Sequence, residues 1–435
     1  MSNIRDASIE PLLCNYAWQD LLQAAHGFGY SLCTFPNETE TPAYPHGRFR
    51  ALLAVGAVET ILIERVSAGQ LHDLKSRLAG AWWFGVVAYD VKNAFERLHS
   101  HNEDFLSLPD LCLFRPQWVF ERRGDKVYCL SGDPEAFWSQ SARQHSLPAG
   151  DMPPAKVGRI YSTVSRQDYE RTVEAIREEI RNGEIYEMNY CIEFRAEDAR
   201  LHAPFKLFET LNQRSPMPFA AFARLGDYYV LSASPERYMK RQGSRLISQP
   251  IKGTAPRGNT PQEDEQVRCR LLQSEKERAE NMMIVDLVRN DLARVGILGT
   301  VEVEELFGIY TFRRLHQMVS TIGVELPPEA SFLDCLTATF PMGSMTGAPK
   351  IRAMELIEQY ETQKRGWYSG ALGYITPQGD FDWNVLIRTI FYNARLQRLS
   401  FQVGSAITYD ASPAQEWAEC LLKARAMHEV LQAYV

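Results

Sequence analysis

Apolar and polar positions follow one another along this chain in a pattern that predicts a mixture of strands and helices. In the first third, apolar runs at 48–64, 82–89 and 111–120 lie between polar turns and predict strands. Apolar residues at helical spacing predict helices at 18–28 and 136–144. This part of the chain is therefore expected to be mixed in structure.

A change of composition divides the chain. Residues 145–165 are rich in proline, glycine and serine, as is typical of a connecting segment. A helix follows, because Ser165 can cap its start, apolar residues recur at helical spacing, and Gly183 can end it. We therefore expect an N-terminal region at 1–150 and a second region, the core, at 165–435.

The second region combines strands with long helices. Apolar runs predict strands at 185–195, 218–224, 227–233, 371–376, 383–394 and 398–408. Helical spacing predicts helices at 263–293, 331–338, 347–362 and 413–433. The last strands come in close succession, as in an antiparallel meander, and do not alternate with helices. The predicted fold class is α+β, with large antiparallel β-sheets flanked by helices.

Composition narrows the classes of function. Of the 435 residues, 45% are hydrophobic and 23% are charged, and the net charge is −7, which argues against a nucleic-acid-binding surface. The longest apolar stretch, 78–89, is too short to cross a membrane. Charged residues near the N-terminus argue against a secretory signal, and eight scattered cysteines without a C-x-x-C pair fit reduced thiols. We expect a cytoplasmic protein without membrane or nucleic-acid partners.

Two of the predicted helices each carry two glutamates about one turn apart. Glu416 and Glu419 share a face of the last helix, whose start is marked by Ser412 as a predicted N-cap. Glu277 and Glu280 have the same spacing on an earlier helix. Such carboxylates suit a hard divalent cation, Mg²⁺ more than Zn²⁺. Taken alone, the pattern also fits solvated helix faces.

A series of motifs along the second region resembles one known family. The motifs are Ser232-Ala-Ser-Pro-Glu-Arg237, Pro250-Ile-Lys-Gly-Thr254, the helix Glu275–Asp291, His316–Thr321, Phe340–Lys350, Tyr368–Tyr374, Ile387–Thr389 and the Glu416/Glu419 helix. In this order they resemble the chorismate-utilising enzymes, which include anthranilate synthase component I, aminodeoxychorismate synthase component I, isochorismate synthase and salicylate synthase. The resemblance covers roughly 165–428, and the segment 83–96 resembles the N-terminal part of the same enzymes more loosely. It implies an anthranilate synthase component I-like fold.

The resemblance also implies a particular reaction. Aminodeoxychorismate synthases have lysine in the P-I-K-G-T motif, as this chain has Lys252, whereas anthranilate synthases have alanine there. A lysine that adds at C2 of the chorismate ring lets ammonia attack C4 and expel the lysine, so that nitrogen ends at C4. The amine must be neutral to attack, so we expect its pKa to be lowered. Glu236 matches the general acid that protonates the departing C4 hydroxyl, which requires a raised pKa.

Ligands are implied by the same matches. Glu280 and Glu419 match direct Mg²⁺ ligands, with Glu277 and Glu416 reaching the ion directly or through water. The residues that match the substrate-binding positions are Gly253, Thr254, His316, Tyr368, Arg388, the expected turn Gly404-Ser405-Ala406, and Lys423. Arg388 is expected to clamp a carboxylate. The role of His316 is left open between catalysis and packing.

Two positions depart from the family pattern. Ala406 adds a methyl group where the family usually has glycine, so the backbone approach to the ligand is in doubt. Glu187 replaces a glutamine common in the aminodeoxychorismate and anthranilate synthases. Isochorismate and salicylate synthases have a lysine there, so its absence argues against those two activities.

A partner is implied as well, because the chain has no segment that resembles a glutaminase. Ammonia is expected from a separate glutamine amidotransferase subunit. The L-L-E-S motif of feedback-inhibited enzymes is missing near the N-terminus, so tryptophan control is not expected, although 215–219 occupies a comparable place. Two other readings stay open, namely anthranilate synthase component I and a non-catalytic chorismate-binding regulatory subunit.

Overall fold

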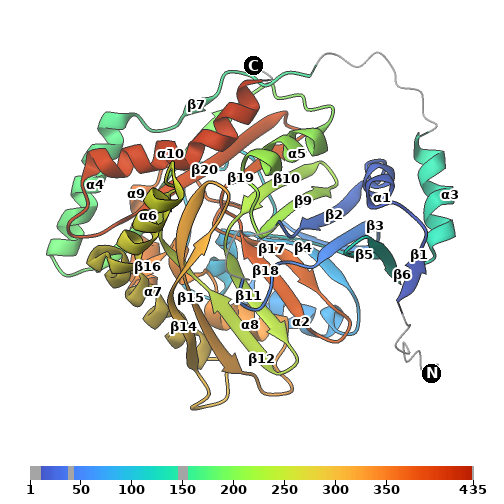
Figure 1. Ribbon diagram of the computed structural model, residues 1–435, viewed down its shortest axis with the longest axis horizontal. Helices are drawn as coiled ribbons and strands as arrows, with labels where there is room; N and C mark the ends of the chain where they lie inside the picture. Colours follow the sequence, from blue (N-terminus) through green and yellow to red (C-terminus); the bar gives the residue numbers. More distant parts are fainter. Residues whose placement is uncertain (1–10, 38–43, 146–154, 434–435) are drawn as a thin grey trace.

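Antiparallel strands form one connected network in the computed structural model, which describes residues 11–37, 44–145 and 155–433 (Figure 1). The network branches at β5 (Leu111–Arg123), because the first residues of this long strand pair with both β3 and β4, and its later residues pair with β3 and β6. The first arm runs through β1 (Leu12–Cys14), β6 (Lys126–Ser131), β5, β3 (Ala51–Ile63), β2 (Tyr30–Phe35), β9 (Phe219–Leu225), β10 (Tyr228–Ser234), β19 (Thr389–Asn393), β20 (Arg398–Ile407) and β8 (Glu187–Ala196), with β7 (Tyr161–Ser162) and β16 (Gly347–Ala348) at its edge.

The second arm starts from the same strand. It runs from β5 through β4 (Trp83–Val87), β17 (Ala371–Ile375), β18 (Phe381–Val385), β11 (Arg237–Gln242), β12 (Arg245–Gln249) and β15 (Leu315–Glu325), which also pairs with β13 (Ile251–Pro256) and β14 (Glu302–Thr311). The two arms are joined again where β10 of the first arm leads directly into β11 of the second, across Pro235 and Glu236. This crossing places Glu236 between the sheets.

Helices cover the outer faces of both arms. They are α1 (Trp18–Ala25), α2 (Ala68–Leu78), α3 (Pro134–His145), α4 (Arg166–Arg181), α5 (Pro204–Arg214), α6 (Pro261–Gln273), α7 (Glu275–Ala293), α8 (Phe332–Thr339), α9 (Lys350–Tyr360) and α10 (Pro413–Gln432), with 3₁₀ turns at Tyr89–Ala94 and Gly343–Met345. Helix α10 lies on β20 beside α4 and α5, while α6 and α7 pack on β13 and β15 (Figure 1). The predicted α+β class, with large antiparallel sheets flanked by helices, is confirmed.

Side-chain alternation along the strands produces two hydrophobic cores. In β9, Phe219, Ala221 and Ala223 face one core, and Ala220 and Phe222 face the other. The first core is shared by strands of both arms with α7 and α8, and the second lies under α1, α4, α5 and α10. This two-sided burial follows from the period of two along a strand.

The N-terminal region shares its sheets with the rest of the chain. Strand β2 pairs with β9, and β4 pairs with β17. Much of the predicted boundary, 146–154, lies outside the described residues, so the division into 1–150 and 165–435 stays a prediction. No helix in the described ranges is both long and apolar enough to cross a membrane.

Several local predictions were wrong in an instructive way. The helix expected at 263–293 is two helices, because Ser274 leaves helical geometry and its side chain accepts a hydrogen bond from the backbone N–H of Glu277. The strand expected at 383–394 breaks at Arg388, whose φ is +51°. Ser412 makes no side-chain cap. The segment 404–406, expected to be a turn, lies inside β20 and pairs with β8.

Candidate active site

Glu236 is a buried carboxyl group at the crossing between the two arms. Its side chain is 4% exposed, and the hydroxyl of Ser344 donates a hydrogen bond of 2.6 Å to its Oε1. Burial raises the pKa of Glu236 to about 7, even though Ser344, Lys252 and the backbone of Ile251 favour the charged form. The adjacent Arg237 does not neutralise it, because this guanidinium binds Asp382 at 2.9 Å. Glu236 can therefore carry a proton near neutral pH.

Lys252 lies in β13 and is also buried, with 8% of its surface exposed. Its Nζ donates a hydrogen bond to Oε1 of Glu187, which is fully buried. Burial alone would lower the pKa of Lys252, but the charges of Glu187, Glu280 and Glu236 outweigh it and the pKa is raised. The lowered pKa expected for this lysine was therefore wrong, and Lys252 is an ammonium here.

Helix α7 fixes the backbone around Lys252. Gly253 has a φ of +97°, and a Cβ there would lie 3.1 Å from a carboxylate oxygen of Glu277 and 3.2 Å from Met318, so the position requires glycine. The amide of Asn281 donates to the carbonyl oxygen of Lys252 at 3.4 Å. Glycine and asparagine thus let β13 and α7 approach closely enough for Glu277 and Lys252 to share one region.

Arg388 presents a guanidinium that has no partner among the described residues. Its backbone is in the left-handed region, with its carbonyl oxygen accepting a hydrogen bond from Ala233 at 3.1 Å, next to the strand that leads to Glu236. Within 11–37, 44–145 and 155–433, its side chain makes no hydrogen bond or ion pair. Burial, with no compensating charge, lowers its pKa to about 10. A half-buried cation of this kind is suited to bind an anionic ligand.

The four glutamates predicted to bind a metal come from α7 and α10. Burial raises the pKa of Glu280 to about 7, with the neighbouring charges of Glu187 and Glu277 adding to the effect of burial. The pKa values of Glu277 and Glu416 are also raised, mainly by burial and in part by the charge of Glu419. The carboxylates of the two helices therefore repel one another electrostatically. An all-oxygen set with mutual repulsion is the kind of donor set that a hard divalent cation relieves.

Two of these carboxylates form ion pairs with lysines. Lys276 lies 3.8 Å from Glu280, and Lys423 lies 2.7 Å from Glu419. Among the residues that the structure describes, no three acidic, histidine or cysteine side chains are close enough to hold an ion as they stand. The chemistry of the donor set fits Mg²⁺, and binding would require the carboxylates to turn away from their lysines.

The remaining predicted substrate-binding residues fall into two groups. Tyr368 is buried, and its hydroxyl lies 3.8 Å from Sγ of Cys191, the residue that pairs with Gly404. Lys423 donates a hydrogen bond of 2.8 Å to the carbonyl oxygen of Gly404. Tyr368 and Lys423 therefore both lie near the part of β20 that contains Gly404. The hydroxyl of Ser405 instead meets Tyr169 at 2.9 Å, on the side of the helices.

His316 is held by both of its ring nitrogens. Nδ1 lies 2.9 Å from the hydroxyl of Thr311, and Nε2 lies 2.9 Å from a carboxylate oxygen of Asp264 in α6. The hydrogen bond from Arg257 keeps the pKa of that carboxyl well below its usual range. With both nitrogens occupied, the geometry favours packing over catalysis. Thr254 is exposed on β13, where it pairs with Gln317.

Comparisons with known proteins identify the family of this chain. The family model described as "chorismate binding enzyme" matches residues 39–429. The chain belongs to this family.

Curated relatives of this chorismate-binding enzyme include both anthranilate synthases and aminodeoxychorismate synthases. It is 34% identical over 360 residues to anthranilate synthase component 1 of Thermus thermophilus, covering 80% of this chain and 77% of that protein. It is 36% identical over 341 residues to aminodeoxychorismate synthase component 1 of Salmonella typhimurium, covering 77% and 73%. The crystal structure of anthranilate synthase component I from Streptococcus pneumoniae superposes with a TM-score of 0.74 at 29% identity, covering 90% and 94%. The protein is thus a chorismate-utilising enzyme.

The sequence patterns did not predict some contacts in the candidate active site of this chorismate-binding enzyme. Ser344 was noted only as part of a motif, and nothing in its spacing indicated that its hydroxyl would reach Glu236. The backbone around Ser344 is held by Asn189, whose amide donates to the carbonyl oxygen of Ser344 at 2.7 Å, and by Arg365, which donates to that of Met345 at 2.6 Å. A buried ion pair between Arg365 and Glu361 supports this arrangement. These are contacts between distant segments, which local patterns do not reveal.

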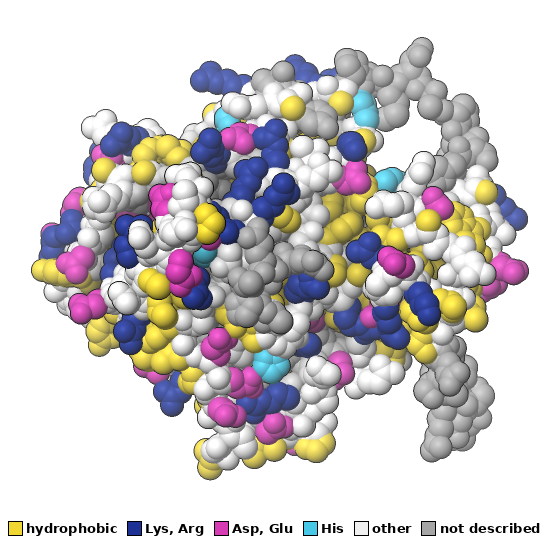
Figure 2. Space-filling view, in the orientation of Figure 1, with side chains coloured by type: hydrophobic (Ala, Val, Ile, Leu, Met, Phe, Trp, Pro, Cys, Tyr) yellow, Lys and Arg dark blue, Asp and Glu magenta, His cyan; other side chains and the backbone are white. Residues whose placement is uncertain are grey.

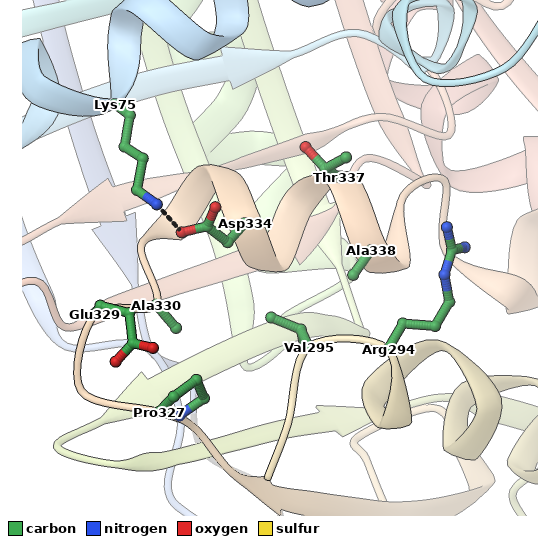
Figure 3. A pocket seen from close by; sticks show the side chains of 9 residues that line it. All are labelled: Lys75, Arg294, Val295, Pro327, Glu329, Ala330, Asp334, Thr337 and Ala338. Carbon is green, nitrogen blue, oxygen red and sulfur yellow. Dashed lines mark ion pairs between the residues drawn. The ribbon is translucent and has the colours of Figure 1, made fainter. Parts of the chain in front are cut away.

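An open cavity of about 450 Å³ lies elsewhere in the molecule (Figure 3). Its walls come from the end of α7, from α8, from Lys75 of α2 and from the segment 327–330. The cation of Lys75 is already paired with Asp334 at 2.7 Å (Figure 3). No predicted catalytic, substrate-binding or metal-binding residue lines this cavity, so it is separate from the candidate active site.

Proposed function

We propose that this enzyme is an aminodeoxychorismate synthase component I, which aminates chorismate at C4 through a covalent intermediate on Lys252. The observation that carries the proposal is a buried lysine in the P-I-K-G-T motif, electrostatically coupled to a buried carboxyl group, Glu236, that is protonated near neutral pH. A nucleophile and an acid in one site are what the double displacement needs. The relatives named aminodeoxychorismate synthase support this assignment.

Lys252 and Glu236 each act twice in the reaction: Lys252 forms and then breaks a bond to C2, and Glu236 gives up and then regains a proton. The neutral amine of Lys252 forms a bond to C2 while the C4 hydroxyl takes the proton of Glu236 and leaves as water. Ammonia then forms a bond to C4, the bond between C2 and Nζ breaks, and the lysine is regenerated. The ammonium formed at C4 returns a proton to Glu236. The sum is chorismate plus ammonia giving 4-amino-4-deoxychorismate plus water.

The proposal assigns binding roles to further residues. Arg388, Tyr368 and Lys423 would hold the substrate carboxylates, and Gly253, Thr254 and 404–406 would add backbone donors. Glu280 and Glu419, assisted by Glu277 and Glu416, would hold Mg²⁺, which when bound neutralises charge on the ring carboxylate. With Glu280 engaged in this way, its charge would no longer favour the ammonium form of Lys252.

The nitrogen source is proposed to be a separate glutamine amidotransferase subunit in the cytoplasm. The name "component 1" of the relatives is consistent with a second component. Acidic and basic side chains are interspersed over most of the face in Figure 2, as suits a protein whose partners are not nucleic acids. In the absence of the partner, ammonium salts should replace glutamine.

The test is to identify the product. The purified chain is incubated with chorismate, Mg²⁺ and ammonium at alkaline pH, and the product is analysed by mass and by coupling to the lyase that releases p-aminobenzoate. We expect 4-amino-4-deoxychorismate, and its loss in Lys252→Ala. Lys206→Ala, which removes an exposed lysine of α5, serves as the matched control.

The competing assignment is anthranilate synthase component I, which the Thermus relative favours. Formation of anthranilate by the unaltered protein would establish that activity and refute amination at C4. A lack of chorismate consumption at high ammonium would instead favour a non-catalytic binding subunit.

A further inference from the structure

Glu187 is the residue in direct contact with Lys252. It is the first residue of β8 and is fully buried, and its Oε1 accepts the hydrogen bond from Nζ. Its Oε2 is also buried and has no hydrogen-bond partner within the described ranges. The backbone here is fixed on the β16 side, where Glu187 pairs with Ala348 and Tyr186 donates to Ala348 at 2.7 Å. The carboxylate is therefore held against the lysine by the sheet itself.

A lysine in this pair must lose a proton before it can act as a nucleophile. The acidic groups whose charges act on Lys252 are Glu187, Glu280 and Glu236, with Glu277 and Glu419 further along α7 and α10. Glu236 is already assigned the proton that leaves with the C4 hydroxyl. Glu280 is assigned to the metal. Of these carboxylates, Glu187 is the one hydrogen-bonded to Nζ, and it has not been assigned another role in the mechanism.

The unpartnered oxygen makes Glu187 a suitable proton acceptor. A carboxylate held by arginine or by backbone N–H groups is a poor base, because those donors stabilise its charged form. Within the described residues, Lys252 is the donor that Glu187 has. Moving one proton along this hydrogen bond turns a buried ion pair into a neutral pair, which removes two charges from a poorly solvated place.

Resting on the lysine mechanism proposed above, we infer that Glu187 is the general base for Lys252. Glu187 takes a proton from the ammonium as Nζ forms its bond to C2, and the C4 hydroxyl leaves with the proton of Glu236. When ammonia attacks C4, the bond between C2 and Nζ breaks and the lysine leaves as a neutral amine. Glu187 then returns its proton to that amine, so no proton is gained or lost over the cycle.

This role has a consequence for the pH dependence of the first step. Because Glu187 and Lys252 share one proton, attack on C2 needs no net loss of a proton to water. The pH dependence of adduct formation is then that of Glu236 alone, whose proton leaves with the C4 hydroxyl, so the rate falls as pH rises above about 7. A glutamine at this position keeps a hydrogen-bond acceptor for Nζ but cannot take the proton. Lys252 must then lose its proton to solvent, so the rate relative to that of the unaltered protein rises with pH.

The experiment follows the adduct itself. The protein is mixed with chorismate and Mg²⁺ without ammonia, quenched at intervals between about pH 6.5 and about pH 9, and the mass of the Lys252 adduct is measured. We expect Glu187→Gln to form the adduct at least about tenfold more slowly than the unaltered protein at neutral pH, with a deficit that shrinks as pH rises. Glu187→Asp retains the carboxylate and is expected to be slower, but with the same pH profile as the unaltered protein.

Controls separate the possible outcomes. Glu184→Gln removes an exposed carboxylate just before β8 and should match the unaltered protein, and thermal melting shows that each variant is folded. If Glu187→Gln forms the adduct at the original rate with the original pH profile, the base role is refuted while the lysine mechanism stands. If the unaltered protein forms no adduct and Lys252→Ala still aminates chorismate, the proposed function itself fails.

Discussion

Ser344 and Glu236, 108 residues apart in sequence, are joined by a buried hydrogen bond of 2.6 Å. Glu236 lies where the chain crosses from one arm of the sheet to the other, and Ser344 lies in the 3₁₀ turn before β16. The bond engages Oε1 of the carboxyl group, while burial keeps the group protonated up to about pH 7. Ser344 thus orients the proposed acid without touching the reacting carbon atoms.

Replacing Ser344 should change both the orientation and the pKa of Glu236. In Ser344→Ala, the hydrogen bond that favours the carboxylate is lost, so the pKa of Glu236 rises further. We expect kcat to fall about tenfold and the alkaline limb of its pH profile to move to higher pH. Rate profiles measured with ammonium would show this. Ser412→Ala removes a hydroxyl that makes no helix cap and should leave the profile unchanged. If Ser344→Ala and Ser412→Ala had identical pH–rate profiles, Ser344 would not control the pKa of Glu236.

Glu236 should make the protein less stable at high pH. Its pKa in the folded state, about 7, is above the usual 4.5, so the folded state binds more protons than the unfolded state between these values. Stability is therefore lost as pH rises from about 4.5 to about 7. We expect Glu236→Gln to be inactive, and to gain roughly 2 kcal/mol in unfolding free energy relative to the original protein between pH 5 and pH 8. Denaturant titrations at both pH values test this, and an unchanged difference would contradict it.

Arg388 should contribute to binding and not to folding. Its guanidinium is half-buried and has no partner in the described chain, so Arg388→Met should leave the melting temperature unchanged or higher. We expect KM for chorismate to rise about 10- to 100-fold, because a charge-assisted contact to a carboxylate is lost. Arg388→Lys retains the charge without the two-pronged geometry and should lie between. Arg425→Met, at an exposed arginine of α10, is the matched control. A lower melting temperature with normal KM would indicate a structural role.

Mg²⁺ should stabilise the folded protein through α7 and α10. Binding relieves the repulsion among Glu277, Glu280, Glu416 and Glu419, so millimolar Mg²⁺ should raise the melting temperature. Glu280→Gln should abolish this shift, whereas Glu275→Gln, an exposed change on the same helix, should retain it. The readout is thermal melting without substrate. An equal shift in both variants would place the ion elsewhere.

Ala406 should be compatible with activity despite its departure from the family pattern. It pairs with Asn189 inside β20 and has no positive φ, so its methyl group causes no backbone strain. We expect Ala406→Gly to change KM for chorismate by less than about threefold. A much larger decrease in KM would show that the methyl group obstructs the substrate.

Sequence patterns determined much of this enzyme. The period of apolar residues predicted the α+β class and about half of the strands, because burial on one or two faces of a strand leaves a direct trace in the sequence. The run from β11 to β15 was not predicted. The motifs identified the family and pointed to Lys252 and Glu236, the two residues proposed to carry out its chemistry. Local backbone conformations were harder to predict from the sequence. The break at Ser274 follows from its extended backbone and its cap on Glu277, whereas the strand at 404–406 depends on pairing between β20 and the distant β8.

Only the tertiary structure decided which groups meet. Glu187 stood out in the sequence as a departure from the family, yet its contact with Lys252 depends on pairing between β8 and β16, so the raised pKa of the lysine was not predictable. Ser344 reaches Glu236 for the same kind of reason. A pKa depends on burial and on charges within a few ångströms, and those neighbours come from segments that are far apart along the chain.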